Sequence, residues 1–219
     1  MSGELVGSGS KVKANPALAG YVMAGGASRR FGSDKALAEF GGRTLLACMC
    51  ELVLAAAGNV HVVAPKGRYA ELEFPSMEDR WPDEGPLGGI ITALGATAAS
   101  HVSAEWNLIV SCDMPFLTRE WLQFLGTKAQ ASDAEVLVPR SGYGLEPLCA
   151  CWRTSAAGTF YAAFESGVRK VTEAMKRVRM EILDEPHWKR FDTAGQLFWN
   201  MNTQEDYEMA LQSWRMRKT

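Results

Sequence analysis

The sequence lacks a long hydrophobic run and an excess of one charge. Its longest apolar stretch, Leu45 to Ala57, carries Glu51 in its middle and is shorter than the roughly 20 residues that a membrane helix needs. Lys plus Arg number 23 and Asp plus Glu number 25, which gives a net charge of −2. This balance excludes a generally basic nucleic-acid binder and an acidic disordered chain. We therefore expect neither a membrane nor a nucleic acid as partner.

Histidine and cysteine are too few or too scattered for several kinds of site. His61, His101 and His187 are tied to no Ser or Cys motif, so a hydrolase triad is not expected. Five cysteines in a chain long enough to fold without disulfides predict reduced thiols and a cytoplasmic protein. The pairs Cys48-x-Cys50 and Cys149-x-Cys151 make a poor zinc site, and we expect buried thiols instead.

The start of the chain, MSGELVGSGSKVKANP, has no apolar core of a secretory signal. Its Gly, Ser and Lys content is typical of a flexible arm. The remainder has an ordinary globular composition, with 47% hydrophobic and 22% charged residues in the whole chain, and shows no repeat or interior linker. We expect an arm over residues 1–16 and a single domain over residues 17–219.

Segments of strand type alternate with segments of helix type, which is typical of an α/β protein. We expect buried strands over residues 19–23, 60–64 and 106–111, each followed by a helix, from residues 45, 86 and 119. The second half predicts strands over residues 135–138, 145–152 and 181–183, and helices over residues 154–165, 171–178 and from 204. The prediction is a three-layer α/β/α sandwich with a mainly parallel sheet, which binds ligands at the carboxyl ends of its strands.

A glycine-rich, cationic segment follows the first predicted strand. It reads Ala24-Gly25-Gly26-Ala27-Ser28-Arg29-Arg30-Phe31-Gly32-Ser33-Asp34-Lys35, which is neither a G-x-G-x-x-G motif nor a Walker A loop. Glycines let backbone N–H groups approach an anion, and arginine and lysine supply positive charge. The segment favours a phosphate-binding loop, with an ordinary cationic strand-to-helix loop as the alternative.

Two further segments contain residues that are typical of a ligand site. Gly85-Pro86-Leu87-Gly88-Gly89 opens a helix whose free N–H groups can face a ligand. Ser111-Cys112-Asp113-Met114-Pro115 places a carboxylate after a buried strand. Mg²⁺ takes one or two such carboxylates together with phosphate oxygens and waters. The alternatives are an ordinary helix after a loop and an Asp that caps a helix, although Thr118 already fills the capping role.

The full loop, Met23-Ala24-Gly25-Gly26-x-Ser28-x-Arg30-Phe31-Gly32-x-Asp34-Lys35, resembles the signature of the molybdenum cofactor guanylyltransferases, the MobA-like nucleotidyltransferases. Methionine stands where the family pattern begins with leucine. Further segments resemble the same family: Gly85-Pro86-Leu87-x-Gly89, Cys112-Asp113-Met114-Pro115-x-Leu117, Glu146-Pro147-Leu148-Cys149-Ala150 and Asn200-x-Asn202-Thr203. The resemblance extends from residue 18 to about residue 215 and implies a Rossmann-like nucleotidyltransferase fold.

The resemblance also implies roles for single residues. Arg30 and Lys35 neutralise the phosphates, and Asp113 holds Mg²⁺; these three are the expected catalytic residues. The expected nucleotide-binding residues are Met23, Ala24, Gly25, Gly26, Lys35, Asp79 and Asp113. Asp83 and Glu84 lie close to Asp79 in sequence and compete with it for that role. The expected acceptor-binding residues are Glu146, Asn200 and Asn202.

The activity that the resemblance implies is the Mg²⁺-dependent transfer of GMP from GTP to Mo-molybdopterin, with release of pyrophosphate. It further implies transient contact with molybdoenzymes or their chaperones. A cytidylyltransferase acting on the same pterin, another nucleotidyltransferase of this fold and a non-catalytic nucleotide-binding subunit stay open as alternatives.

Two features remain outside the motifs. Trp81 either packs in the protein or stacks on a ligand, and the cluster Arg169, Lys170, Lys176, Arg177 and Arg179 is either a solvated face or a contact for a pterin phosphate or a protein.

Overall fold

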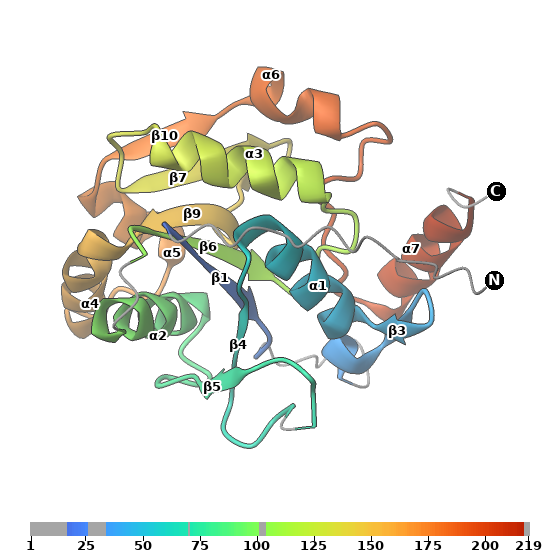
Figure 1. Cartoon of the computed structure of the whole chain (residues 1–219), viewed down its shortest axis with the longest axis horizontal. Coiled ribbons are helices and arrows are strands. Elements are labelled where there is room, and N and C mark those ends of the chain that lie inside the picture. The colour runs from blue at the N-terminus through green and yellow to red at the C-terminus, as the bar shows by residue number, and fades with distance from the viewer. Residues whose placement is uncertain (1–16, 26–33, 70, 101–103, 217–219) are drawn as a thin grey trace, which may run out of the picture.

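The computed structural model describes residues 17–25, 34–69, 71–100 and 104–216. Its main sheet runs in the order β10-β7-β9-β6-β1-β4-β5, with β8 paired to β7 (Figure 1). The strands are β1 (Leu18–Met23), β4 (His61–Ala64), β5 (Ser76–Glu78), β6 (Trp106–Ser111), β7 (Val136–Ser141), β8 (Gly144–Leu145), β9 (Cys149–Arg153) and β10 (Met180–Leu183). A small hairpin pairs β2 (Glu39–Phe40) with β3 (Arg43–Thr44).

The sheet is mixed but mostly parallel, as the sequence predicts. Strand β1 pairs in parallel with β4 and β6, β4 with β5, and β7 with β10. Strand β9 is antiparallel to both β6 and β7, and β8 is antiparallel to β7. The carboxyl ends of β1, β4, β5 and β6 therefore meet at one edge of the sheet, where ligands bind in this class of fold.

Helices cover both faces of the sheet (Figure 1). α1 (Leu45–Ala57) and α3 (Arg119–Gln130) share one core with the sheet, and α2 (Pro86–Ala99) and α4 (Ala157–Glu165) share the other. The strands serve both cores because their side chains alternate between faces. Val22 and Leu108 pack toward α1 and α3, whereas Tyr21 and Ile109 pack toward α2 and α4. This is the three-layer sandwich that the sequence predicts.

The remaining helical segments lie in the second half of the chain and after the glycine-rich segment. They are η1 (Lys35–Leu37), η2 (Thr154–Ala156), α5 (Val171–Ala174), η3 (Met175–Arg177), α6 (Glu185–Trp188), η4 (Lys189–Phe191) and α7 (Gln204–Met216). Among the helices of the described residues, none combines the length and apolar character required to cross a lipid bilayer. The five cysteines are all free, and Cys48 alone is not fully buried.

Capping residues set the helix boundaries that the sequence indicates. The Thr118 hydroxyl accepts the Trp121 N–H at 3.2 Å and starts α3. Thr203 and Asp206 exchange hydrogen bonds of 2.9 and 3.1 Å at the start of α7. Gly58 ends α1 in the left-handed conformation, with φ of 80°. These local bonds satisfy backbone groups that a helix end otherwise leaves unpaired.

The predicted strand over residues 145–152 is wrong in its middle. Residues Glu146–Leu148 separate β8 from β9, because Pro147 has no N–H for a ladder and the Cys149 N–H bonds back to the Glu146 carbonyl at 3.0 Å. The helix expected over residues 154–165 begins with the tighter turn η2, and the one over 171–178 divides into α5 and η3. The expected arm over residues 1–16 lies outside the described residues.

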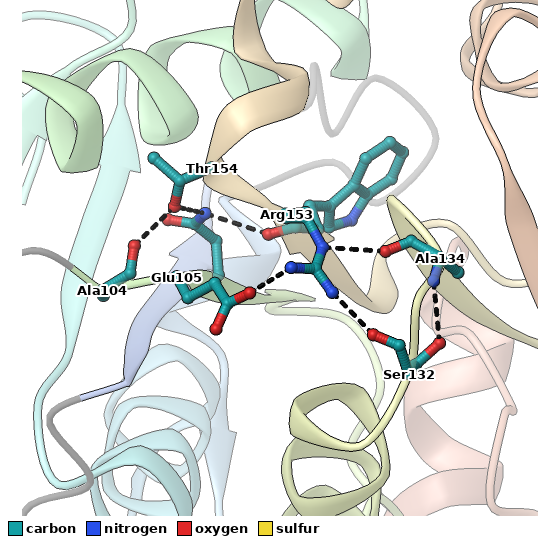
Figure 2. Close-up of polar contacts among 8 residues, drawn as sticks. Ala104, Glu105, Ser132, Ala134, Arg153 and Thr154 are labelled. Carbon is teal, nitrogen blue, oxygen red and sulfur yellow. Dashed lines mark hydrogen bonds and ion pairs between the residues drawn. The ribbon is translucent and has the colours of Figure 1, made fainter.

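Arg153 joins three segments of the chain at the end of the sheet that lies opposite the carboxyl ends of β1 and β6 (Figure 2). Its guanidinium donates to the carbonyls of Ser132 and Ala134 at 2.6 and 2.9 Å, and it forms an ion pair with Glu105. The same group lies 4.5 Å from the centre of the Trp106 ring. Arg153 thus connects the start of β6, the end of β9 and the segment before β7, away from the ligand-binding edge.

Candidate active site

A cavity of about 580 Å³ opens at the carboxyl ends of β1, β4, β5 and β6. We call it the larger cavity. It is lined by Met23, Gly25, Lys35, Val63, Asp79, Asp83, Gly85, Pro86, Gly89, Ser111, Cys112, Asp113 and Leu148. The residues come from segments far apart in sequence that the parallel strands bring to one edge. The larger cavity has the size and the mixed polar and apolar lining of a small-molecule site.

A second cavity of about 250 Å³, the smaller cavity, adjoins the first. Its lining is Ser111, Asp113, Met114, Glu146, Pro147, Leu148, Asn200 and Asn202. Ser111, Asp113 and Leu148 line both cavities and form the wall between them. Two molecules bound in the two cavities would therefore meet at Asp113.

Asp113 forms the central ion pair of the site. Its Oδ2 atom lies 2.6 Å from Lys35 Nζ, and each side chain is 14% exposed. Lys35 Nζ also donates to the Met201 carbonyl at 3.3 Å. The Met201 N–H in turn donates to the Asp113 carbonyl at 2.9 Å. The segment before α7 is thereby joined to the end of β6, which places Asn200 and Asn202 beside Asp113.

The remaining Asp113 oxygen suits a hard cation. Oδ1 is buried and accepts no hydrogen bond from the residues that the structure describes. A buried carboxylate oxygen without a donor is costly unless a ligand satisfies it. No group of three His, Cys, Asp or Glu side chains lies together in the described part of the chain. One carboxylate with an oxygen left for a ligand is compatible with Mg²⁺, which typically takes one or two carboxylates and fills its other positions from phosphates and water.

Asp79 lines the larger cavity and is held by two donors. Its Oδ1 atom accepts the Trp81 N–H at 3.0 Å and the Thr92 hydroxyl at 3.2 Å. Its Oδ2 atom faces Gly89, where an added Cβ would lie 3.5 Å from this oxygen and 2.2 Å from Met23 Cε. Glycine at position 89 therefore keeps the cavity open between Met23 and Asp79. Sequence reasoning missed Thr92, which has no motif of its own.

The loop from Asp79 to Gly85 is braced from outside the cavity. Asp83 and Gly85 have positive φ angles, of 68° and 84°, and Asp83 lines the cavity beside Asp79. The Arg169 Nε atom lies 2.6 Å from Glu84 Oε2, and its guanidinium stacks 3.9 Å from the Phe164 ring centre. Arg169 thus ties this loop to the end of α4.

Trp81 packs within the protein, and two residues of the basic cluster form ion pairs. The Trp81 ring packs against Tyr161 and Phe164, with ring centres 6.0 and 5.3 Å apart, so the packing alternative describes it. Of the basic cluster, Lys176 pairs with Glu173 at 2.7 Å on the surface. Arg169 is the member that reaches toward the larger cavity, through Glu84.

Glu146 is the buried carboxylate of the smaller cavity. Its side chain accepts the Ser141 hydroxyl at 2.5 Å, and the residue is only 6% exposed. Burial raises the pKa of this carboxyl above its ordinary value, and the nearby Asp113 charge raises it further, against the Ser141 hydrogen bond. Sequence reasoning missed Ser141, whose contact depends on the turn between β7 and β8.

The structure brings most of the predicted site residues together. Met23, Gly25, Lys35, Asp79 and Asp113 line the larger cavity, and Glu146, Asn200 and Asn202 join Asp113 in the smaller one. Ala24 lines neither cavity, and its N–H is already bonded to the Val63 carbonyl at 2.9 Å. Gly26 and Arg30 lie outside the described residues.

Comparison with known proteins places this site in a family. The model of the MobA-like NTP transferase domain matches residues 20–179. A "Probable molybdenum cofactor guanylyltransferase" from Bacillus cytotoxicus is 28% identical over 196 residues, which cover 87% of this chain and 94% of that protein. A protein of the same name from a Nostoc species is 29% identical over 194 residues, or 86% of this chain and 88% of that one.

Solved structures agree with this fold. The molybdopterin-guanine dinucleotide biosynthesis protein A from Archaeoglobus fulgidus has a TM-score of 0.77 and 25% identity, covering 92% of this chain and all of that one. The 2-C-methyl-D-erythritol 4-phosphate cytidylyltransferase from Thermus thermophilus shares the fold, with a TM-score of 0.63 and 17% identity over 89% of this chain and 98% of that one. Since the family model covers most of the residues that build the sheet and the larger cavity, the chain belongs to the MobA-like NTP transferase family.

Proposed function

We propose that this protein is a molybdenum cofactor guanylyltransferase, which transfers GMP from GTP to Mo-molybdopterin and releases pyrophosphate. The observation that carries the proposal is the position of Asp113 on the wall shared by the two cavities, with Lys35 bonded to it. The relatives that share this name over most of the chain support the choice of acceptor and nucleotide.

In this proposal the nucleotide occupies the larger cavity. The base and ribose lie near Met23, Asp79 and Gly89, where glycine leaves room for them. The triphosphate lies toward Lys35 and the start of α2, whose first N–H groups follow Pro86. Arg30 adds a second positive charge to the phosphates, as the family resemblance implies. Together these groups offset the negative charge of a nucleoside triphosphate.

Asp113 would hold Mg²⁺ in this proposal, through the oxygen that accepts no hydrogen bond from the described residues. The ion, held there by Asp113, would supply positive charge that offsets the charge of the phosphate oxygens. Lys35 stays close to the same carboxylate and contributes a further fixed charge. The protein therefore concentrates positive charge where the departing pyrophosphate gains negative charge.

The transfer needs no protein nucleophile. An oxygen of the acceptor's terminal phosphate attacks the α-phosphorus of GTP and forms a new P–O bond. The bond between that phosphorus and the oxygen bridging to the β-phosphate breaks, and its electron pair leaves with pyrophosphate. Cys112 faces the larger cavity, but its burial raises the pKa of the thiol, which disfavours the nucleophilic thiolate. Catalysis then depends on positioning and on charge stabilisation.

The acceptor occupies the smaller cavity. Asn200 and Asn202 offer both hydrogen-bond donors and acceptors, and Glu146 offers a buried carboxylate. Pro147 and Leu148 add apolar surface that suits the flat face of a pterin. The acceptor's phosphate then reaches the Asp113 wall, because that wall is common to both cavities.

Pyrophosphate release with Mg²⁺ and Mo-molybdopterin tests the proposal, with GTP compared with CTP. We expect turnover with GTP in the parent protein and loss of turnover in Asp113→Asn, which keeps the side-chain shape and removes the charge. The matched control is Asp133→Asn, since Asp133 is exposed in the loop between α3 and β7. A preference for CTP would move the protein to the cytidylyltransferases, and binding of GTP without turnover would favour a non-catalytic nucleotide-binding subunit.

A further inference from the structure

Asp34, the residue before Lys35, is fixed by an unusual number of contacts. Its Oδ1 atom accepts the Ala36 N–H at 3.1 Å and its carbonyl accepts the Leu37 N–H at 3.0 Å, which starts the short helix η1 at Lys35. The Ala38 N–H then donates to the Lys35 carbonyl at 3.2 Å. The backbone of Lys35 is thus held by the turn that Asp34 begins.

Two residues from the turn after β4 hold the Asp34 carboxylate from the other side. The Tyr69 hydroxyl lies 3.0 Å from Oδ1 and 2.8 Å from Oδ2. Arg68 Nη2 lies 2.9 Å from Oδ2. Tyr69 and Asp34 are 35 positions apart in sequence, so these bonds join the β4 turn to the segment that carries Lys35. The chain of contacts continues from Lys35 Nζ to Asp113 Oδ2 at 2.6 Å.

The backbone of Tyr69 is adapted to this contact. Its φ is 60°, a left-handed conformation that a bulky aromatic residue rarely adopts. The ring packs partly buried against the core beside α1 and α3, and the Arg68 guanidinium lies 5.7 Å from its centre. Such a conformation persists where surrounding contacts determine it. Here those contacts are the core on one side and the Asp34 carboxylate on the other.

We propose that Tyr69 and Arg68 are positioning residues for the phosphate site. By holding Asp34 they set the direction of Lys35, so that its ammonium group points to Asp113 and to the phosphates bound there. The inference deepens the proposed function, because it needs Lys35 to contact the phosphates that leave as pyrophosphate. It does not depend on which base or which acceptor the enzyme uses.

The protonation state of Tyr69 is consistent with this role. Burial raises the pKa of its hydroxyl, and the Asp34 carboxylate raises it further. The hydroxyl therefore stays protonated at neutral pH and donates to Asp34. A phenylalanine at this position keeps the ring in the core and removes only the donor.

The test measures binding of pyrophosphate with Mg²⁺ by calorimetry, in the parent, Tyr69→Phe, Lys35→Met and the double variant. Pyrophosphate is the product for every nucleotide and acceptor that the family uses in such transfers. We expect Tyr69→Phe to weaken binding about threefold to tenfold, because a misdirected lysine contacts the phosphates less well. Lys35→Met weakens binding further, and adding Tyr69→Phe to it has no additional effect.

Two further variants test whether the effect of Tyr69→Phe comes from its contact with Asp34. Tyr207→Phe is the matched control, since the Tyr207 hydroxyl donates to the Glu39 carbonyl at 2.6 Å. It should bind pyrophosphate like the parent. Arg68→Gln removes the second contact to Asp34. The Arg68 side chain is 43% exposed, so this variant should fold even if Tyr69→Phe does not. It should weaken pyrophosphate binding by less than Tyr69→Phe does. This loss too should vanish in the Lys35→Met background.

Parent-like binding by both Tyr69→Phe and Arg68→Gln would overturn the inference. So would an equal loss in the presence and absence of Lys35, because that result means a general structural effect. A parent protein that binds no pyrophosphate would overturn it as well, since Lys35 would then not serve the phosphates. In another outcome, the parent and the three variants bind pyrophosphate as expected while GTP and Mo-molybdopterin give no product. In that case the proposed function fails and this inference stands.

Discussion

Lys35 Nζ lies 2.6 Å from Asp113 Oδ2, although the two residues are 78 positions apart in sequence. The pair joins the end of the glycine-rich segment to the end of β6, the central strand of the site. It is largely buried, and Asp113 Oδ1 accepts no hydrogen bond from the described residues, so we propose this oxygen as the metal contact.

Replacing Lys35 with methionine keeps the length of the side chain and removes its charge. Pyrophosphate release from GTP should fall by about 10²-fold or more, because a charge that stabilises the leaving group is lost. The free energy of unfolding should fall by about 1–3 kcal/mol, since Asp113 loses its charged donor while remaining buried. Steady-state kinetics and denaturant unfolding measure the two effects.

Lys176→Met is the control for this change. Lys176 pairs with Glu173 on the surface, and exposed ion pairs contribute about 0–1 kcal/mol. Activity should stay at the parental level. Undiminished turnover in Lys35→Met would contradict the role that we assign to this residue.

Gly89→Ala should damage nucleotide binding while leaving the fold intact. The added methyl group would lie 2.2 Å from Met23 Cε, and the flexible thioether must move into the larger cavity to make room. We expect the KM for GTP to rise about tenfold, equivalent to about 1.4 kcal/mol, with a smaller change in kcat. Kinetics with varied GTP check this expectation.

Gly95→Ala is the matched variant, because Gly95 lies in the same helix α2 with no atom within 4 Å of an added Cβ. It should leave KM unchanged and stabilise the protein by about 0.5–1 kcal/mol, since alanine favours a helix over glycine. Equal KM values for the two variants would show that Gly89 does not shape the nucleotide site.

Arg169→Gln tests the brace on the loop from Asp79 to Gly85. The change removes the ion pair with Glu84 and the stacking on Phe164. The loop then holds Asp83 and Gly85 less firmly at the larger cavity, so we expect the KM for GTP to rise about threefold, or about 0.6 kcal/mol. Arg177→Gln is the comparison, because its guanidinium bonds to Ser166 on the surface. A parental KM in Arg169→Gln would show that Arg169 does not support nucleotide binding.

The raised pKa of Glu146 predicts a pH-dependent stability. The folded protein binds its proton more tightly than the unfolded chain does, so the stability contributed by this group falls as pH rises from the unfolded pKa through the folded pKa. Glu146→Gln carries no such proton. The unfolding free energy of Glu146→Gln minus that of the parent should therefore increase with pH across this window.

Denaturant unfolding at several pH values between about 4 and 7 measures this difference. Glu165→Gln serves as the exposed control at the end of α4 and should track the parent at every pH. A difference between Glu146→Gln and the parent that does not vary with pH would contradict the burial argument.

Part of the site is predictable because two of its motifs follow buried parallel strands. The segments at Gly25 and Asp113 follow strands that the sequence predicts, and the topology of the sheet brings them together without further information. Helix caps such as Thr118 are local in sequence. For these features the sequence contains both the chemistry and the position. Asp79 follows β5, a strand that the sequence does not predict.

The contacts that orient the site are harder to predict. Thr92 on Asp79, Ser141 on Glu146 and Tyr69 on Asp34 each join a motif residue to a side chain with no pattern of its own. Strand β5 was missed because two of its three residues are exposed, so that it has no apolar signal. These features depend on tertiary geometry, which hydrophobic periodicity does not encode.

The central claim is that Asp113 stands between a nucleotide and an acceptor that the enzyme joins. The most direct measurement is the mass of the product formed from GTP, Mg²⁺ and Mo-molybdopterin, together with the pyrophosphate released. The account predicts one GMP attached to the pterin phosphate for each pyrophosphate, and no such product with Asp113→Asn. Release of pyrophosphate or phosphate without a dinucleotide, or full product formation by Asp113→Asn, would contradict it.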